Sequence, residues 1–140
     1  CTCSESKIKQ YNGKLSGPLL DRIDIIISFQ EVNFEELRLD GKSESSSQIK
    51  KRIEKAREIQ KNRFINNFRK INASMNKEEI NIYCTLDHQG ELLLKEAYSF
   101  LNFSARTYDK ILKVARTIAD LKGNEKVSAD DIGEAIHYRS

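Results

Sequence analysis

The stretch of the sequence best suited to chemistry is SGPLLDRID, residues 16–24, because it places an arginine beside two acids at the start of an apolar run. Arg22 stays protonated at physiological pH and offers a planar fork of N–H donors to phosphate oxygens. Asp21 and Asp24 flank Arg22 and can hold its guanidinium group in place. The spacing alone leaves a plainer interpretation open, in which Arg22 forms a structural or surface ion pair with one of these acids.

The rest of the sequence offers few residues for catalysis. It contains no glycine-rich phosphate loop ending in Lys-Ser or Lys-Thr, so we do not expect this chain to cradle a triphosphate by that route. His88 and His137 have no cysteine or histidine partner at a metal-ligand spacing, and we expect them to be surface or capping residues. Hydrolysis by this chain alone is therefore not expected.

Composition is typical of a soluble globular chain, because 39% of the 140 residues are hydrophobic and 32% are charged. The apolar runs are too short for a transmembrane span, so no membrane partner is expected. The three cysteines do not form a framework typical of secreted proteins, which favours a cytoplasmic location. The net charge of +3 permits contact with nucleic acid without requiring it. Because the chain begins with Cys1 rather than Met, we expect it to belong to a longer protein.

A polar, serine-rich linker over residues 40–47 divides the expected elements into two groups. Before the linker we expect a short polar helix over residues 4–15, a turn, and a buried β-strand over the β-branched run at residues 23–29. After it, apolar residues at helical spacing predict a long charged helix over residues 48–68 and then a bundle of shorter helices.

Capping residues predict where the helices of this bundle begin and end. Asn76, Asp87 and Ser104 precede apolar runs at helical spacing and are the residue types that accept the free N–H groups of a first helical turn. Gly123 follows the longest of these runs and is expected to end its helix. Cys84 lies among apolar helix residues and is expected in the core.

The long charged helix is also a candidate surface for nucleic acid. Its basic side chains are spaced so that they could follow a phosphate backbone. Two interleaved glutamates favour the alternative, in which intrahelical ion pairs form on an ordinary solvated face. The basic residues of this hypothesis are Lys50, Lys51, Lys55 and Arg57.

Four stretches together resemble one protein family in order and spacing: residues 16–24, 103–108, 111–121 and 135–140. They are similar to the magnesium-chelatase-like AAA+ ATPases of bacteria, in the group that includes the competence-associated branch-migration helicases. The resemblance covers nearly the whole chain and is weakest in the linker. It implies a mainly α fold, a helical-bundle lid preceded by the last helix and strand of an α/β AAA+ core. Residues 1–42 would be the C-terminal remnant of that nucleotide-binding core with the linker, and residues 43–140 the helical lid.

The resemblance also implies roles for three residues of the site. Arg22 matches an arginine finger, which is supplied to the nucleotide bound by the neighbouring subunit. Arg106 matches the sensor-2 arginine, which is directed at the phosphates from the lid. Asp21 would orient Arg22 or contact the adjacent subunit. The shared physical logic is that positioned cations stabilise the charge on a transferring phosphoryl group.

The implied function is that of a C-terminal part of an oligomeric ATP-dependent motor whose parent protein remodels DNA. ATP and Mg²⁺ would be bound by the parent, and the partners would be neighbouring subunits of a homo-oligomeric, hexameric ring. The alternative hypothesis is a nucleic-acid-binding helical module without a role in hydrolysis. Cys1 and Cys3 would be half of a zinc site if related proteins supply further cysteines upstream, and are otherwise free thiols in this chain.

Overall fold

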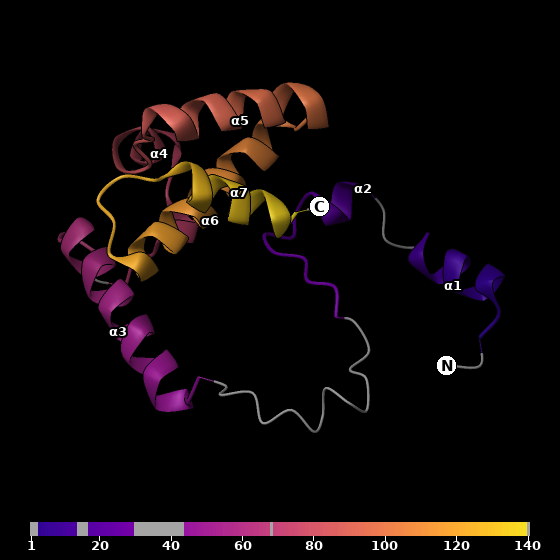
Figure 1. Cartoon of the computed structure of the whole chain (residues 1–140), viewed down its shortest axis with the longest axis horizontal. Coiled ribbons are helices and arrows are strands. Elements are labelled where there is room, and N and C mark those ends of the chain that lie inside the picture. The colour runs from indigo at the N-terminus through magenta and orange to yellow at the C-terminus, as the bar shows by residue number, and fades with distance from the viewer. Residues whose placement is uncertain (1–2, 14–16, 30–43, 68, 140) are drawn as a thin grey trace.

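The computed structural model describes residues 3–13, 17–29, 44–67 and 69–139 of the chain. In these residues the backbone forms seven α-helices and one 3-10 helix, so the expected mainly α architecture is confirmed (Figure 1). Among them, no helix is both long and apolar enough to cross a membrane. The helices are α1 (Glu5–Asn12), α2 (Gly17–Leu20), α3 (Ser46–Arg63), η2 (Asn72–Ser74), α4 (Lys77–Tyr83), α5 (His88–Leu101), α6 (Ala105–Lys122) and α7 (Ala129–His137).

Side-chain caps set the boundaries of the helices in the bundle. Asn76 precedes α4, Asp87 precedes α5 and Ser104 precedes α6, and each side chain accepts a backbone N–H from the first turn of its helix. Gly123 ends α6 with a φ of 78°, in the left-handed region that glycine adopts without strain. The four boundaries predicted from these residues are confirmed.

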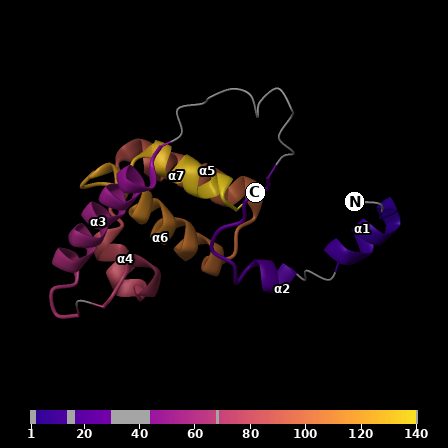
Figure 2. The same cartoon turned by 90° about the horizontal axis from the view of Figure 1, so that it is seen from below.

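Helix α6 is the centre of the bundle. It packs against α3, α4, α7 and η2, while α5 packs against α7. Figures 1 and 2 show that α3 crosses α6 near the C-terminal end of α6, and that α1 lies apart from the bundle. The inward face of α6 is fully buried at Ile111, Ala115 and Ala119. Cys84 is buried in the same core, as expected from the sequence.

A buried polar network fixes α3 to α6. Both guanidinium nitrogens of Arg63 donate to the carboxylate of Asp120, each over 2.6 Å. Arg116, whose side chain is only 1% exposed, donates to the same carboxylate over 3.1 Å, and Asn72 donates to it over 2.8 Å. A buried carboxylate with this many donors is compensated for its desolvation, so the network positions the last turn of α3.

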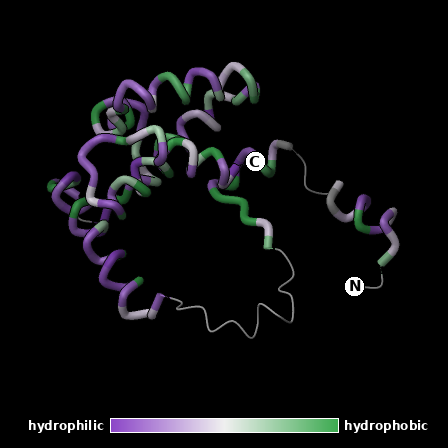
Figure 3. Tube along the Cα trace, in the orientation of Figure 1, coloured by the Kyte–Doolittle hydropathy of each residue, from purple (hydrophilic) through white to green (hydrophobic). Residues whose placement is uncertain are grey.

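The strand expected over residues 23–29 is not formed in the described part of the chain. These residues are extended, and past Ile23 their backbone makes one described hydrogen bond, from the Ile26 N–H to the Tyr138 carbonyl over 2.8 Å. Phe29 is 90% exposed, and Figure 3 shows the segment as an apolar stretch of chain outside the bundle. A strand needs a neighbouring strand to pair its N–H and C=O groups, and the described residues supply none. The prediction of a buried strand is therefore wrong for this chain by itself.

The long helix is shorter than predicted. It was expected over residues 48–68, and α3 ends at Arg63, where Phe64 leaves the helical conformation and inserts into the core. The expected boundary between residues 42 and 43 lies outside the described residues.

Candidate functional site

The carboxylate of Asp21 joins the turn after α2 to the start of α6. Its Oδ1 accepts a hydrogen bond from the Thr107 hydroxyl over 2.6 Å and another from the Ser104 hydroxyl over 3.1 Å. Ser104 is also the N-cap of α6, since its Oγ accepts the Thr107 N–H over 3.1 Å. Residues more than 80 positions apart in the chain are thereby brought together, so the turn after α2 is hydrogen-bonded to the first turn of α6.

The surroundings of Asp21 favour its charged form. The hydrogen bond from Thr107 is the largest influence and lowers the pKa of Asp21 below its ordinary value, against a smaller opposing effect of partial desolvation. The Ser104 hydroxyl and the positive charges of Arg106 and Arg139 lower it further. Asp21 is therefore a carboxylate at neutral pH, held by two hydroxyl groups.

Arg22 is placed by the backbone while its side chain extends into solvent. Its N–H donates to the Leu19 carbonyl over 3.0 Å, which closes the turn. The guanidinium is exposed, and none of the described residues makes a hydrogen bond or ion pair with it. The plainer interpretation paired Arg22 with Asp21 or Asp24, but Asp21 binds the start of α6 and Asp24 binds Lys110 over 2.7 Å.

Arg106 is likewise exposed, in the first turn of α6 between the two residues that hold Asp21. It has no hydrogen bond or ion pair with the part of the chain that the structure describes, although its charge is felt by Asp21. The N-terminus of an 18-residue helix adds a further positive field at this place. We call Asp21, Arg22, Ser104, Arg106 and Thr107 the arginine corner: it presents two exposed guanidinium groups suited to an anion.

Arg139 lies against the arginine corner, although its position in the sequence predicted no role for it there. Its side chain is 7% exposed. It donates to the Ile23 carbonyl, lies 3.4 Å from the Thr107 hydroxyl and lies 3.8 Å from Oδ1 of Asp21. Arg139 and Ile23 are separated by 116 residues, so no local pattern could have revealed this contact.

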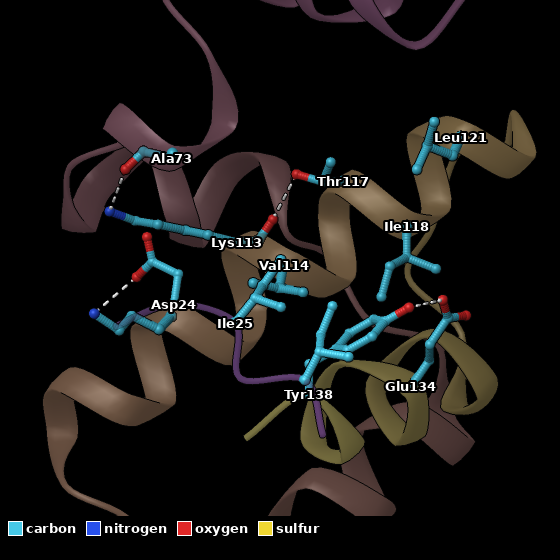
Figure 4. A pocket seen from close by; sticks show the side chains of 12 residues that line it. Asp24, Ile25, Ala73, Lys113, Val114, Thr117, Ile118, Leu121, Glu134 and Tyr138 are labelled. Atoms are coloured by element: carbon cyan, nitrogen blue, oxygen red, sulfur yellow. Dashed lines mark hydrogen bonds and ion pairs between the residues drawn. The ribbon is translucent and has the colours of Figure 1, made fainter. Parts of the chain in front are cut away.

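A pocket of about 490 Å³ lies beside the arginine corner, between the extended segment after the turn and helices α6 and α7. Figure 4 shows Ile25, Val114 and Ile118 facing this pocket, with Tyr138 donating to Glu134 at one side. The Asp24 ion pair with Lys110 lies at its other side. Aliphatic side chains dominate the lining, so the pocket suits an apolar group better than a triphosphate.

The basic face of α3 is exposed but partly neutralised. Lys50 pairs with Glu54 over 3.9 Å, which agrees with the solvated alternative for this residue. Lys51, Lys55 and Arg57 are exposed, and no ion pair joins them to the described residues. These three residues keep the nucleic-acid hypothesis open.

Metal ligation finds no support in the described residues, which contain no cluster of three or more cysteine, histidine or acidic side chains. Cys3 is exposed with a free thiol, and Cys1 lies outside the described residues. Burial raises the pKa of Cys84 to about 11, so this thiol stays protonated and serves packing.

Comparison with known proteins shows the family of the chain. Residues 43–139 match the family described as magnesium chelatase, subunit ChlI C-terminal, and residues 1–37 match the family described as magnesium chelatase, subunit ChlI. The chain belongs to the magnesium chelatase ChlI family. The resemblance inferred from the sequence is therefore confirmed, and the two matches meet near the linker expected between the two regions.

Curated relatives of this family member are longer proteins. Competence protein ComM of Haemophilus influenzae is 38% identical over 138 residues, which are 98% of this chain and 26% of that protein. Protein YifB of Salmonella typhimurium is 35% identical over 99% of this chain and 27% of its own length. A Mycobacterium tuberculosis protein, Rv2897c, is 31% identical with the same coverage. The chain thus spans about a quarter of the length of these relatives.

Proposed function

We propose that this chain is the part of an oligomeric ATP-driven motor that delivers two arginines to a nucleotide bound by a neighbouring subunit. Arg22 is the arginine finger, and Arg106 is the sensor-2 arginine that contacts the phosphates from the lid. The observation that carries the proposal is that both guanidinium groups are exposed at one corner, without an acidic partner among the described residues.

Other arginines of the bundle give a contrast that supports this assignment. Arg116 is buried, Arg63 is nearly so, and both pair with the Asp120 carboxylate, so their charges are partly compensated within the fold. The charges of Arg22 and Arg106 remain available to an external anion. A phosphoryl group in transfer carries negative charge on its outer oxygens, and preorganised cations stabilise that charge without first breaking other ion pairs.

In this proposal Asp21 is a positioning residue. Its carboxylate is hydrogen-bonded to the start of α6, so it holds the turn that carries Arg22 next to Arg106. The parent protein supplies the phosphate loop, the acidic residues for Mg²⁺ and the ATP itself. The partners are neighbouring subunits of a homo-oligomeric ring, in which one subunit presents its arginine corner to the nucleotide of the next.

A complementation assay tests the finger. In the full-length protein, Arg22→Ala should lower ATP turnover by about 10³-fold or more, as expected for loss of an arginine finger, with nucleotide affinity little changed. Mixing Arg22→Ala subunits with subunits disabled in their own phosphate loop should restore turnover, because the two defects then lie in different subunits. Lys126→Ala, an exposed residue outside the arginine corner, is the control.

Two results would contradict the proposal. Unchanged turnover of Arg22→Ala would remove the finger assignment. Inactive variants that also fail to complement each other would show that Arg22 acts within its own subunit.

DNA is the proposed substrate of the parent motor, and the alternative is that the chain is itself a nucleic-acid-binding module. The observation that favours the alternative is the exposed and unpaired state of Lys51, Lys55 and Arg57 among the described residues. If these side chains contact phosphates, DNA affinity falls steeply with salt, and replacing the three by alanine should flatten the logarithmic salt slope by about 3. Absence of binding at low salt would eliminate the module hypothesis.

A further inference from the structure

Arg139 has the contacts of a residue that holds the arginine corner together. Its nearly buried guanidinium touches both sides of the corner: it donates to the Ile23 carbonyl on the turn and approaches the Thr107 hydroxyl on α6. Its charge also faces Asp21, which links the same two sides. One side chain therefore contacts the turn that carries Arg22, the first turn of α6, and the Asp21 carboxylate that joins them.

We propose that Arg139 is a positioning residue that locks the turn carrying Arg22 to the start of α6, so that Arg22 and Arg106 move as one unit. The inference rests on the proposed function and extends it to a residue outside the corner. No substrate contact is assigned to Arg139, because its side chain is covered by the turn and by α6.

The backbone around Arg139 strengthens the lock. The carbonyl of Tyr138 accepts the Ile26 N–H over 2.8 Å, so the two residues that follow α7 hold the chain at both Ile23 and Ile26. Helix α7 is itself anchored in the core by Ile132 and Ala135, both fully buried. The residues that follow α7 thereby fix the turn that carries Arg22 to the core of the bundle.

The chemistry of arginine is needed at this position. The two terminal nitrogens of Arg139 point to different acceptors, one to the Ile23 carbonyl and the other towards Thr107 and Asp21. A planar guanidinium spans such a pair of acceptors, whereas a lysine ammonium is a single point of charge on a flexible stem. Lysine should therefore keep the charge beside Asp21 but hold the turn less firmly.

Steady-state ATP turnover of the full-length protein tests the positioning role. A misplacement of about 1 Å at a catalytic group lowers turnover by about 10²-fold, so we expect Arg139→Ala to lower kcat by about that factor with KM changed by less than about twofold. Arg139→Lys should fall between Arg139→Ala and the unchanged protein. The double variant Arg22→Ala, Arg139→Ala should be no slower than Arg22→Ala alone, since a lock has no effect once the finger is gone.

Hydrogen–deuterium exchange of the same proteins tests the lock without reference to activity. Arg139→Ala should accelerate exchange in the peptide that contains the Ile26 N–H, while Lys126→Ala should not. Arg139→Lys keeps a long, charged side chain and serves as the measured variant if the alanine variant does not fold.

The outcomes separate this inference from the function on which it rests. If Arg22→Ala keeps full turnover, the finger assignment is refuted, and only the exchange data then test whether Arg139 locks the turn to α6. If Arg22→Ala is inactive, the positioning role is overturned by unchanged kcat in both Arg139 variants. It is also overturned if the losses of the two single variants multiply in the double variant. Unchanged exchange at Ile26 overturns the lock itself.

Discussion

Replacing Asp120 with asparagine should destabilise the bundle more than any other change of one charge, because this carboxylate compensates two arginines at once. Asp120 has no exposed side-chain surface, Arg116 is 1% exposed and Arg63 is 11% exposed. Asparagine keeps the shape but leaves both guanidinium groups without a counter-charge. Arg116 retains its hydrogen bonds to the Glu125 and Asn124 carbonyls over 2.6 and 2.5 Å, which limits the loss.

The expected magnitude follows from this burial. Removing one partner of a buried ion pair costs about 3–5 kcal/mol, and the surviving carbonyl contacts put Asp120→Asn near the lower value, about 3 kcal/mol. Each kcal/mol shifts Tm by about 4–8 °C in a domain of this size, so Tm should fall by about 12–24 °C.

Thermal unfolding followed by circular dichroism measures this change. Asp109→Asn is the matched control, because Asp109 lies on the same helix but its ion pair with Lys77 is exposed, with 58% of the lysine side chain in solvent. That control should cost no more than about 1 kcal/mol. Equal Tm values for Asp120→Asn and Asp109→Asn would refute the view that the buried network holds α3 on α6.

Three further outcomes follow from local geometry and charge. Gly133→Ala should raise the free energy of unfolding by about 0.5–1 kcal/mol in urea titrations, because its added Cβ lies 3.9 Å from the nearest atom and alanine favours a helix. Gly90→Ala should instead lower it, because its Cβ would meet the Ser128 backbone carbon at 3.3 Å; equal effects would contradict this reasoning. Burial would raise the pKa of Asp131, but hydrogen bonds from Lys122 and Ser128 outweigh it and lower that pKa below its ordinary value. The unfolded state then binds more protons in acid, so the stabilisation is present above about pH 4 and is lost as pH falls through the folded pKa. Asp131→Asn should flatten this acid dependence, and an unchanged slope would exclude Asp131 as its source.

Local signals in the sequence predicted correctly where α4, α5 and α6 begin. Asn76, Asp87 and Ser104 cap the helices that follow them, because a short polar side chain before an apolar run serves the free N–H groups of the first turn wherever the helix finally packs. The prediction that Cys84 lies in the core was right for a similar reason, since its neighbours share one apolar face.

Features that depend on distant parts of the chain were not predictable. The β-branched run at residues 23–29 has the composition of a buried strand, but a strand also needs a partner, and none lies among the described residues. The contact of Arg139 with Ile23 joins residues 116 positions apart, and no periodicity extends over that distance. Which arginines would pair with a buried acid was equally hidden, because the sharing of Asp120 by Arg63 and Arg116 exists only in the packed bundle.

Helix α3 is anchored near one end only, which makes it a rigid arm. Residues 46–55 are all exposed, and burial begins at Ala56 and continues at Gln60. About 15 Å of helix therefore extends beyond Ala56, at 1.5 Å per residue. A tilt of roughly 10° at the anchor displaces the far end by about 3 Å, which follows from that length and the rise per residue. Small rotations of α6 are thereby magnified at Ser46, where the chain from the arginine corner re-enters the bundle.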